Sequence, residues 1–304
     1  MSSLSVVSEL GARVVNAIEA QEWLDEPGYR VEHGLALTFN LFGRRAEKVR
    51  NFLHGTWLGH PLHPVLTDVP LGAWSVALAL DAADTVHATP WAGRAAQFAV
   101  AVGVAGATAA AVTGLTDWQY THDRGRRTGM VHGLVNLGAV GLYSWSWRDR
   151  RTGRQGRGQV ASLIGFGLVS AASYLGGHLV YRDRIGVDHT EDPAGPHAFM
   201  DVAAAEDLVS DGPLSVRAGD VAVVVVRHGD TIHAVSGRCP HLGAPLGEGW
   251  VHRDGIECPW HGSLFDLATG KVLKGPAVAP LACFEVRERD GRIEVRRRTA
   301  VEAR

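Results

Sequence analysis

The sequence predicts an α-helical membrane bundle of four transmembrane helices, followed by a separate all-β domain. Residues 95–116, 128–147 and 158–181 contain no Asp, Glu, Lys or Arg, although 20% of the 304 residues are charged. At about 1.5 Å per residue, each stretch is long enough to cross a hydrocarbon core of about 30 Å. From about residue 199 onward, short β-like runs alternate with Gly-Asp and Asp-Gly turns, which is typical of a small-sheet domain.

Composition removes several classes of protein. A formal net charge of -2 offers no basic face for nucleic acid. The three cysteines are too few for a disulfide scaffold. We therefore expect a lipid bilayer and no nucleic acid as partners, and composition leaves the oligomeric state open.

The first element is a polar region at 1–50 with helical spacing, which ends in a basic run. Its start lacks the features of a signal peptide. A segment rich in His, Pro and Gly then leads into an apolar stretch at about 64–83, the first of the four spans in a membrane domain at 51–185. The spans are rich in small residues, which favour close helix packing in lipid.

The distribution of basic residues predicts the orientation. Nine Lys and Arg residues lie on the side of the bundle that holds the chain termini, and six lie on the other side. The positive-inside rule therefore favours cytoplasmic termini. We expect an integral protein of a bacterial inner membrane, with the β domain on the cytoplasmic side.

A polar linker at 186–198 separates the bundle from the β domain at 199–304. The linker carries two prolines and several charges. The strands that we expect in the β domain are Val221–Val226, Thr231–Val235, Cys283–Val286 and Arg292–Val295.

The candidate chemistry lies in two short motifs of the β domain. Cys239 and His241 form Cys-x-His, and Cys258 and His261 form Cys-x-x-His. A Cys2His2 zinc site usually takes both cysteines from one loop, whereas here each loop offers one thiolate and one imidazole. This interleaving allows one iron to take both cysteines and the other both histidines, as in a Rieske centre. Zinc remains the alternative.

Residues 239–248 and 258–266, with Gly275-Pro276 and Pro280 further on, resemble the Rieske 2Fe–2S domain of the ferredoxin type. The resemblance implies that Cys239 and Cys258 bind the buried iron and that His241 and His261 bind the outer iron. It also implies a proline loop at 275–280 over the cluster and Ser263 as a hydrogen-bond donor to it.

Two departures from the family pattern matter. The Rieske proteins of cytochrome bc complexes join the two cluster loops by a disulfide, and those places here are Ala244 and Trp260. The third cysteine, Cys283, is therefore expected to be a buried apolar residue. Phe265 stands where the family usually has a tyrosine, so one hydrogen bond that would raise the cluster potential is missing. We expect a potential below the bc type.

The bundle half contains a second group of candidate residues. Four alternating helices bring the start of the first and third and the end of the second and fourth to one face, where ionisable side chains gather. Ionisable groups inside a bundle are candidates for a haem, metal or quinone site. Alternatively, they pack structurally or reach water. The candidates are His60, His63, Asp68, Asp117, His132 and His178.

The bundle also resembles an uncharacterised bacterial family of four-helix membrane domains. The residues that carry this resemblance include His-Pro-Leu-His-Pro at 60–64, Pro70 to Trp74, Gly114 to Trp118 and His132. No activity follows from it.

We expect a membrane-anchored Rieske electron-transfer protein rather than a self-contained enzyme. It would pass single electrons between a redox partner in the membrane, a quinone or a haem, and a protein partner. Two alternatives are a membrane oxidoreductase with an intramembrane His/Asp site and a redox-sensing anchor protein. A Rieske oxygenase is disfavoured because no histidine follows His261 to build a mononuclear iron site.

Overall fold

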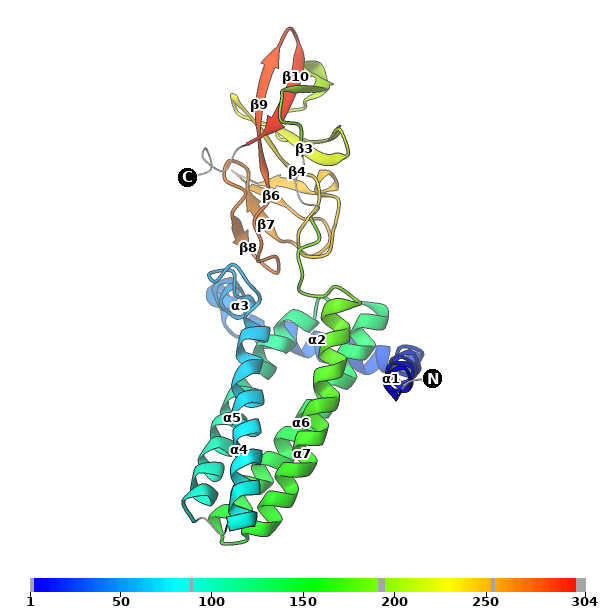
Figure 1. The fold of residues 1–304 in the computed structure, drawn as a ribbon. Coiled ribbons are helices and arrows are strands. Elements are labelled where there is room, and N and C mark those ends of the chain that lie inside the picture. Colours follow the sequence, from blue (N-terminus) through cyan, green and yellow to red (C-terminus); the bar gives the residue numbers. More distant parts are fainter. Residues whose placement is uncertain (1–2, 88–89, 191–194, 253–254, 299–304) are drawn as a thin grey trace. The chain divides into compact units, whose positions relative to one another are not determined.

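The computed structural model describes residues 3–87, 90–190, 195–252 and 255–298 (Figure 1). The chain forms two compact units, and each is discontinuous in sequence. The helical unit comprises residues 1–43 and 62–185, and the β unit comprises residues 44–61 and 186–304. Residues 191–194 of the predicted linker lie outside the described residues.

Four long helices run up and down to form the bundle of the helical unit (Figure 1). With 26 to 29 residues each, they are about 40 Å long, which exceeds the hydrocarbon thickness of a bilayer. The helices are α4 (Leu62–His87), α5 (Pro90–Trp118), α6 (Asp123–Arg151) and α7 (Gln155–Tyr181).

Three of these helices are long and apolar enough to cross a membrane by length and composition. They are α4 over Leu62–Val86, α5 over Trp91–Trp118 and α7 over Gln155–Tyr181. The fourth helix, α6, contains the charge-free stretch 128–147, but both of its ends are highly charged and its mean hydropathy is low. The predicted apolar bundle is confirmed for three spans.

The bundle closes on small residues and one aromatic pair. Trp74 of α4 stacks on Tyr143 of α6 with ring centroids 3.9 Å apart and planes 4° from parallel. Ala77, Val100 and Ala139 are fully buried around this pair. Small side chains allow the helices to approach closely, which is how helices associate where lipid offers no hydrophobic driving force.

The predicted N-terminal helical region forms α1 (Ser3–Glu19), α2 (Asp25–Asn40) and α3 (Ala46–His54). The first two pack against the start of α6 (Figure 1). Arg127 of α6 binds them there: its guanidinium forms a bidentate ion pair with Asp25, and its Nη1 donates to the backbone oxygen of Glu19. The third helix, α3, belongs to the β unit.

The β unit contains two antiparallel sheets, which confirms the predicted all-β domain. The larger sheet has the strand order β1-β10-β9-β4-β3-β2, and the smaller has the order β5-β6-β7-β8. The larger sheet comprises β1 (Met200–Ala204), β2 (Pro213–Ala218), β3 (Val221–His228), β4 (Thr231–Ser236), β9 (Cys283–Arg289) and β10 (Arg292–Arg297). The smaller comprises β5 (Trp250–His252), β6 (Gly255–Glu257), β7 (Leu264–Asp266) and β8 (Val272–Lys274).

Strand β3 is apolar on both faces because each face covers a core. Val224 and Val226 pack into the core that also contains both cluster-motif cysteines, and Val223 and Val225 pack into a second core with Phe284. Successive side chains of a strand point to opposite faces, so a continuous valine run is what a strand between two cores requires. This arrangement gives the cysteine loops a rigid floor.

Candidate functional site

The two cysteines of the motifs occupy equivalent loops. Cys239 lies on the loop after β4 and Cys258 on the loop after β6. Four residues later, Gly243 and Gly262 donate their N–H to the carbonyl of the corresponding cysteine, at 2.8 and 3.1 Å. Both glycines have a positive φ, +77° and +68°, which a glycine adopts at no steric cost. The same tight turn is thus built twice.

The turns bury the sulfurs. Cys239 and Cys258 are each 1% exposed, and neither forms a disulfide. The two thiols contact each other: the side-chain hydrogen bond between them lowers the pKa of Cys258 to about 6. The backbone N–H groups of His261 and Trp260 lower this pKa as well, against the effect of burial. The same contact and burial raise the pKa of Cys239. A thiolate is the form that binds a metal.

The two histidines lie on the outer side of the loops. The rings of His241 and His261 have centroids 5.0 Å apart and planes at 89°. Both residues are half-buried, in contrast to the cysteines. A donor set of two buried sulfurs and two half-exposed imidazoles fits the asymmetric ligation of a Rieske [2Fe-2S] cluster.

The proline loop packs against this donor set. Ala277 is buried in the same core as both cysteines, and its N–H donates to the hydroxyl oxygen of Ser263 at 3.0 Å. Ser263 is fully buried, and its carbonyl accepts the N–H of Cys258 at 2.8 Å. Ser263 therefore connects the second cysteine loop to the proline loop.

Cys283 takes no part in the motif loops. It begins strand β9, is half-buried and packs against the core that contains Cys239 and Cys258. Burial raises the pKa of its thiol, as expected for a cysteine that serves as an apolar residue.

Helix α3 contributes two residues that sequence reasoning missed. The amide of Asn51 bridges the chain just before the proline loop: its Oδ1 accepts from Gly275 N–H at 3.0 Å, and its Nδ2 donates to Leu273 O at 3.2 Å. His54 is 1% exposed and packs against Gly275, where a Cβ would lie 3.1 Å from the imidazole. These partners are more than 200 positions apart, so no local pattern could have revealed them.

The candidates in the bundle do not converge on one site. His63 and His132 lie together, with ring centroids 6.5 Å apart. Asp68 is exposed on α4, and Asp117 lies half-buried on the last turn of α5. His60 belongs to the β unit.

His178 joins a different group. Its Nε2 lies 3.4 Å from Oε1 of Glu19 and 3.6 Å from Oδ1 of Asp183. Among the described residues, these three form the one group of three or more His, Cys or carboxylate ligand atoms that lie mutually within 4.8 Å. Burial raises the pKa of Asp183, while the neighbouring His178 lowers it. The group is a compact cluster of polar side chains where α1 meets the end of α7.

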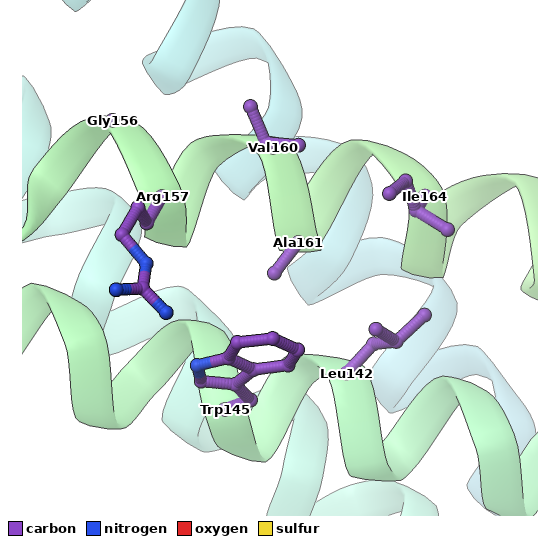
Figure 2. A pocket seen from close by; sticks show the side chains of 7 residues that line it. All are labelled: Leu142, Trp145, Gly156, Arg157, Val160, Ala161 and Ile164. Atoms are coloured by element: carbon purple, nitrogen blue, oxygen red, sulfur yellow. The ribbon is translucent and has the colours of Figure 1, made fainter.

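One cavity in the bundle lies elsewhere, between α6 and α7. It has a volume of about 340 Å³ and is lined by apolar side chains of α6 and α7 (Figure 2). Arg157 lies over the ring of Trp145 at its edge, with the guanidinium carbon 5.8 Å from the ring centroid. An aromatic residue beside a basic one is typical of a membrane interface. The lining contains no histidine, cysteine or carboxylate, so we assign no chemistry to this cavity.

Two family matches agree with this geometry. Residues 198–285 match the Rieske [2Fe-2S] domain, and residues 59–189 match a family described as a predicted membrane protein, DUF2231. Ferredoxin CarAc of Metapseudomonas resinovorans is 37% identical over 98 residues, which are 32% of this chain and 92% of that ferredoxin.

Further relatives share the same region. Apoptosis-inducing factor 3 of Homo sapiens is 31% identical over 119 residues, which are 39% of this chain. The match spans only 20% of the human protein's length. A solved structure described as a complex of reduced oxygenase and oxidized ferredoxin in carbazole 1,9a-dioxygenase contains a chain that is 34% identical. That alignment covers 34% of this chain and 98% of the other, with a TM-score of 0.32. The chain belongs to the Rieske [2Fe-2S] family, and its Rieske domain is fused to a DUF2231 membrane domain.

Proposed function

We propose that this protein is a membrane-anchored electron carrier whose Rieske domain binds one [2Fe-2S] cluster through Cys239, Cys258, His241 and His261. The observation that carries the proposal is the pair of equivalent loops, which hold two buried sulfurs behind two half-exposed imidazoles. A bound cluster of this type accepts and releases one electron at a time.

The residues around the cluster have separate tasks. Cys239 and Cys258 hold the inner iron, because both are buried and their side chains contact each other. His241 and His261 hold the outer iron and offer their ring edges to a partner. Ser263 accepts from Ala277 N–H, so its own O–H is available as a donor to a cluster sulfur.

The helical unit supplies the membrane anchor. Three apolar helices support this role, and we propose that residues 128–147 of α6 form the fourth span. Nine basic residues against six favour cytoplasmic termini in a bacterial inner membrane. With four spans, the chain enters and leaves the membrane on the same side. The Rieske domain, which follows the last span, would then lie in the cytoplasm.

The electron partner that we favour is another redox protein. One relative is a ferredoxin, and a ferredoxin of this type is described in complex with an oxygenase. A quinone or a haem of the membrane is the second candidate partner, and the observation that favours it is the contact between His63 and His132 inside the bundle.

Spectroscopy of the full-length protein in detergent tests the cluster assignment. The dithionite-reduced protein should show a Rieske EPR signal, with two iron and two acid-labile sulfide per chain. Cys258→Ser should abolish the signal. The matched control, Cys283→Ser, should retain it, because Cys283 lies outside the motif loops. Stoichiometric zinc without labile sulfide would refute the assignment, and so would loss of the signal in the control.

A further inference from the structure

The bundle is built from two helical hairpins that make the same internal contacts. In the α4–α5 hairpin, His63 hydrogen-bonds through Nδ1 to the backbone oxygen of Ala110 at 2.8 Å. In the α6–α7 hairpin, His132 hydrogen-bonds through Nδ1 to the backbone oxygen of Ala172 at 2.9 Å. The two histidines are 69 positions apart and the two alanines 62. The hairpins can therefore be aligned helix by helix if the segment between histidine and alanine is seven residues longer in the first hairpin.

A glycine faces each histidine at an equivalent place. A Cβ at Gly114 would lie 2.8 Å from the ring of His63, and a Cβ at Gly176 would lie 3.1 Å from the ring of His132. These glycines are also 62 positions apart, like the two alanines. Each imidazole is therefore held against its own hairpin by one carbonyl and one glycine.

The correspondence continues along the helices. Trp74 lies over Gly103 and Tyr143 over Gly165, so that any side chain at either glycine would overlap an aromatic ring. Trp74 and Tyr143 are again 69 positions apart, and the glycines 62. The repeat thus covers the length of both hairpins rather than the histidines alone.

Contacts between the hairpins join equivalent positions. Such self-complementary pairing is the property of an approximate two-fold axis that runs between two copies, and parallel repeats of this kind have their axis along the membrane normal. The three pairs are His63–His132, Trp74–Tyr143 and Asp81–Arg150.

The hydrogen bonds define which nitrogen of each ring is available. A carbonyl oxygen only accepts, so Nδ1 of both histidines carries a proton, and each ring in its neutral form has its lone pair on Nε2. The side-chain nitrogen of Asn136 lies 3.2 Å from Nε2 of His132, where it can donate to that lone pair. Donation from Nδ1–H to a carbonyl is the arrangement that orients a histidine ligand of a metal.

We propose that His63 and His132 bind one transition-metal centre through Nε2, near the approximate two-fold axis of the bundle. Neutral imidazole binds iron, copper, zinc and nickel. At about 2.0 Å per metal–nitrogen bond, two imidazoles on one metal have ring centroids about 6 Å apart, close to the observed 6.5 Å. The metal would displace the Asn136 donor from Nε2.

The number of ligands indicates which form of the metal suits the pair. Among the described residues, the one three-member group of candidate ligand atoms is Glu19, His178 and Asp183, which includes neither His63 nor His132. A bare ion usually needs more than two protein ligands, whereas haem iron needs at most two axial ligands from the protein, and two histidines can supply them. The shared chemistry is two imidazoles on one metal, supplied either by haem or by an ion. The site is separate from the cluster motifs and can fail without them.

Two isosteric substitutions separate metal binding from a structural role. In asparagine, Nδ2 takes the place of histidine Nδ1, so His63→Asn and His132→Asn can keep the bond to the carbonyl but lose Nε2. The opposite exchange, His132→Gln, removes the Nδ1 donor. His33, exposed on α2, provides the matched control His33→Asn.

The test measures metal and haem in the full-length chain in detergent, as purified and after titration with Co²⁺ or haemin. We expect one centre per chain beyond the two cluster irons. A Soret band identifies haem, and Co²⁺ ligand-field absorption without it identifies an ion site. The Asn variants should bind at least about tenfold more weakly, since loss of even an orienting group costs about 10- to 100-fold. The Asn variants should keep the wild-type melting temperature and the Rieske EPR signal. The control His33→Asn should keep both and should also bind metal as tightly as the wild type.

The wild-type protein alone can overturn the proposal. If it takes up neither Co²⁺ nor haemin more tightly than the His63→Asn/His132→Asn double variant, the pair is not a metal site. Destabilisation by His132→Gln, together with no metal in the wild type, would identify the histidines as hydrogen-bonded connections between helices. The Cys258→Ser protein should still bind metal or haem at the histidine pair even though its EPR signal is lost, so the two assignments can fail independently.

Discussion

Asn51 is expected to hold the proline loop against the cluster motifs, and its removal should loosen that loop. The side chain makes two hydrogen bonds across the loop's start, to Gly275 N–H and to Leu273 O. Each bond contributes about 0.5–1.5 kcal/mol net, so Asn51→Ala should cost about 1–3 kcal/mol of local stability. The Leu273 bond is exposed, which favours the lower half of this range.

Hydrogen–deuterium exchange of the full-length protein measures this cost directly. At about 1.4 kcal/mol per factor of ten, the amide of Gly275 should exchange about 5- to 150-fold faster in Asn51→Ala, because local opening exposes it. Asn51→Asp keeps an acceptor for Gly275 N–H and loses only the donor to Leu273, so Gly275 should stay close to the wild-type rate. Glu47→Ala, at an exposed position of the same helix, is the control.

An unchanged exchange rate at Gly275 would contradict this prediction. If Gly275 exchanges at the wild-type rate in Asn51→Ala, while the rest of the β unit is unchanged, helix α3 does not restrain the loop. Because Ala277 lies in the same core as both cysteines, a loosened loop should also speed the loss of cluster iron to a chelator by a similar factor. A faster exchange without a faster loss of iron would separate the loop from cluster protection.

Three further predictions concern the cluster and the bundle. Redox titration by EPR should place the cluster nearer the lower end of the Rieske range, about -150 to +300 mV, because the disulfide and one hydroxyl donor of the bc type are missing; a value at the quinol-oxidising upper end would contradict this. Asp81→Asn should lower the free energy of unfolding in detergent by about 3–5 kcal/mol, because Arg150 would lose its counter-charge while its side chain is 0% exposed and that of Asp81 7%. An unchanged thermal transition would show that the ion pair does not stabilise the bundle. Gly103→Leu should destabilise the bundle by about 1–3 kcal/mol, because the new side chain would overlap Trp74. The control Gly72→Leu should be neutral, since Gly72 is exposed and a Cβ there would meet no described residue within 4 Å. Equal effects of the two substitutions would show that the contact with Trp74 does not matter.

Much of the protein could be predicted from local pattern. The cluster motifs are readable because each loop carries its own cysteine, histidine and glycine within a few residues, so that ligand type and turn geometry are local properties. Membrane helices are readable for the same reason, since exclusion of charge over about twenty residues is a property of one segment. The structure confirms the predicted all-β domain, and the family matches confirm its fusion to a membrane domain.

The count of spans shows where composition is insufficient. Helix α6 has a charge-free middle but also Asn, His and Ser residues and charged ends. Several of these polar groups are satisfied by packing, as Ser146 is through Gly158 O and Ser162. Hydropathy scores the segment as if it were alone in lipid, so α6 falls short although it forms a full-length member of the bundle.

The two halves of the protein, the cysteine and histidine motifs and the apolar helices could be predicted from the chain, because each depends on residues that are close in sequence. The tertiary structure was needed to show which polar groups share a site. Of six bundle candidates it brought His63 and His132 together and placed His178 with Glu19 and Asp183. It also set Asn51 on the proline loop. The His63–His132, Glu19–His178 and Asn51–Gly275 contacts join residues that are 69, 159 and 224 positions apart, and packing at such separations leaves no local pattern in the chain.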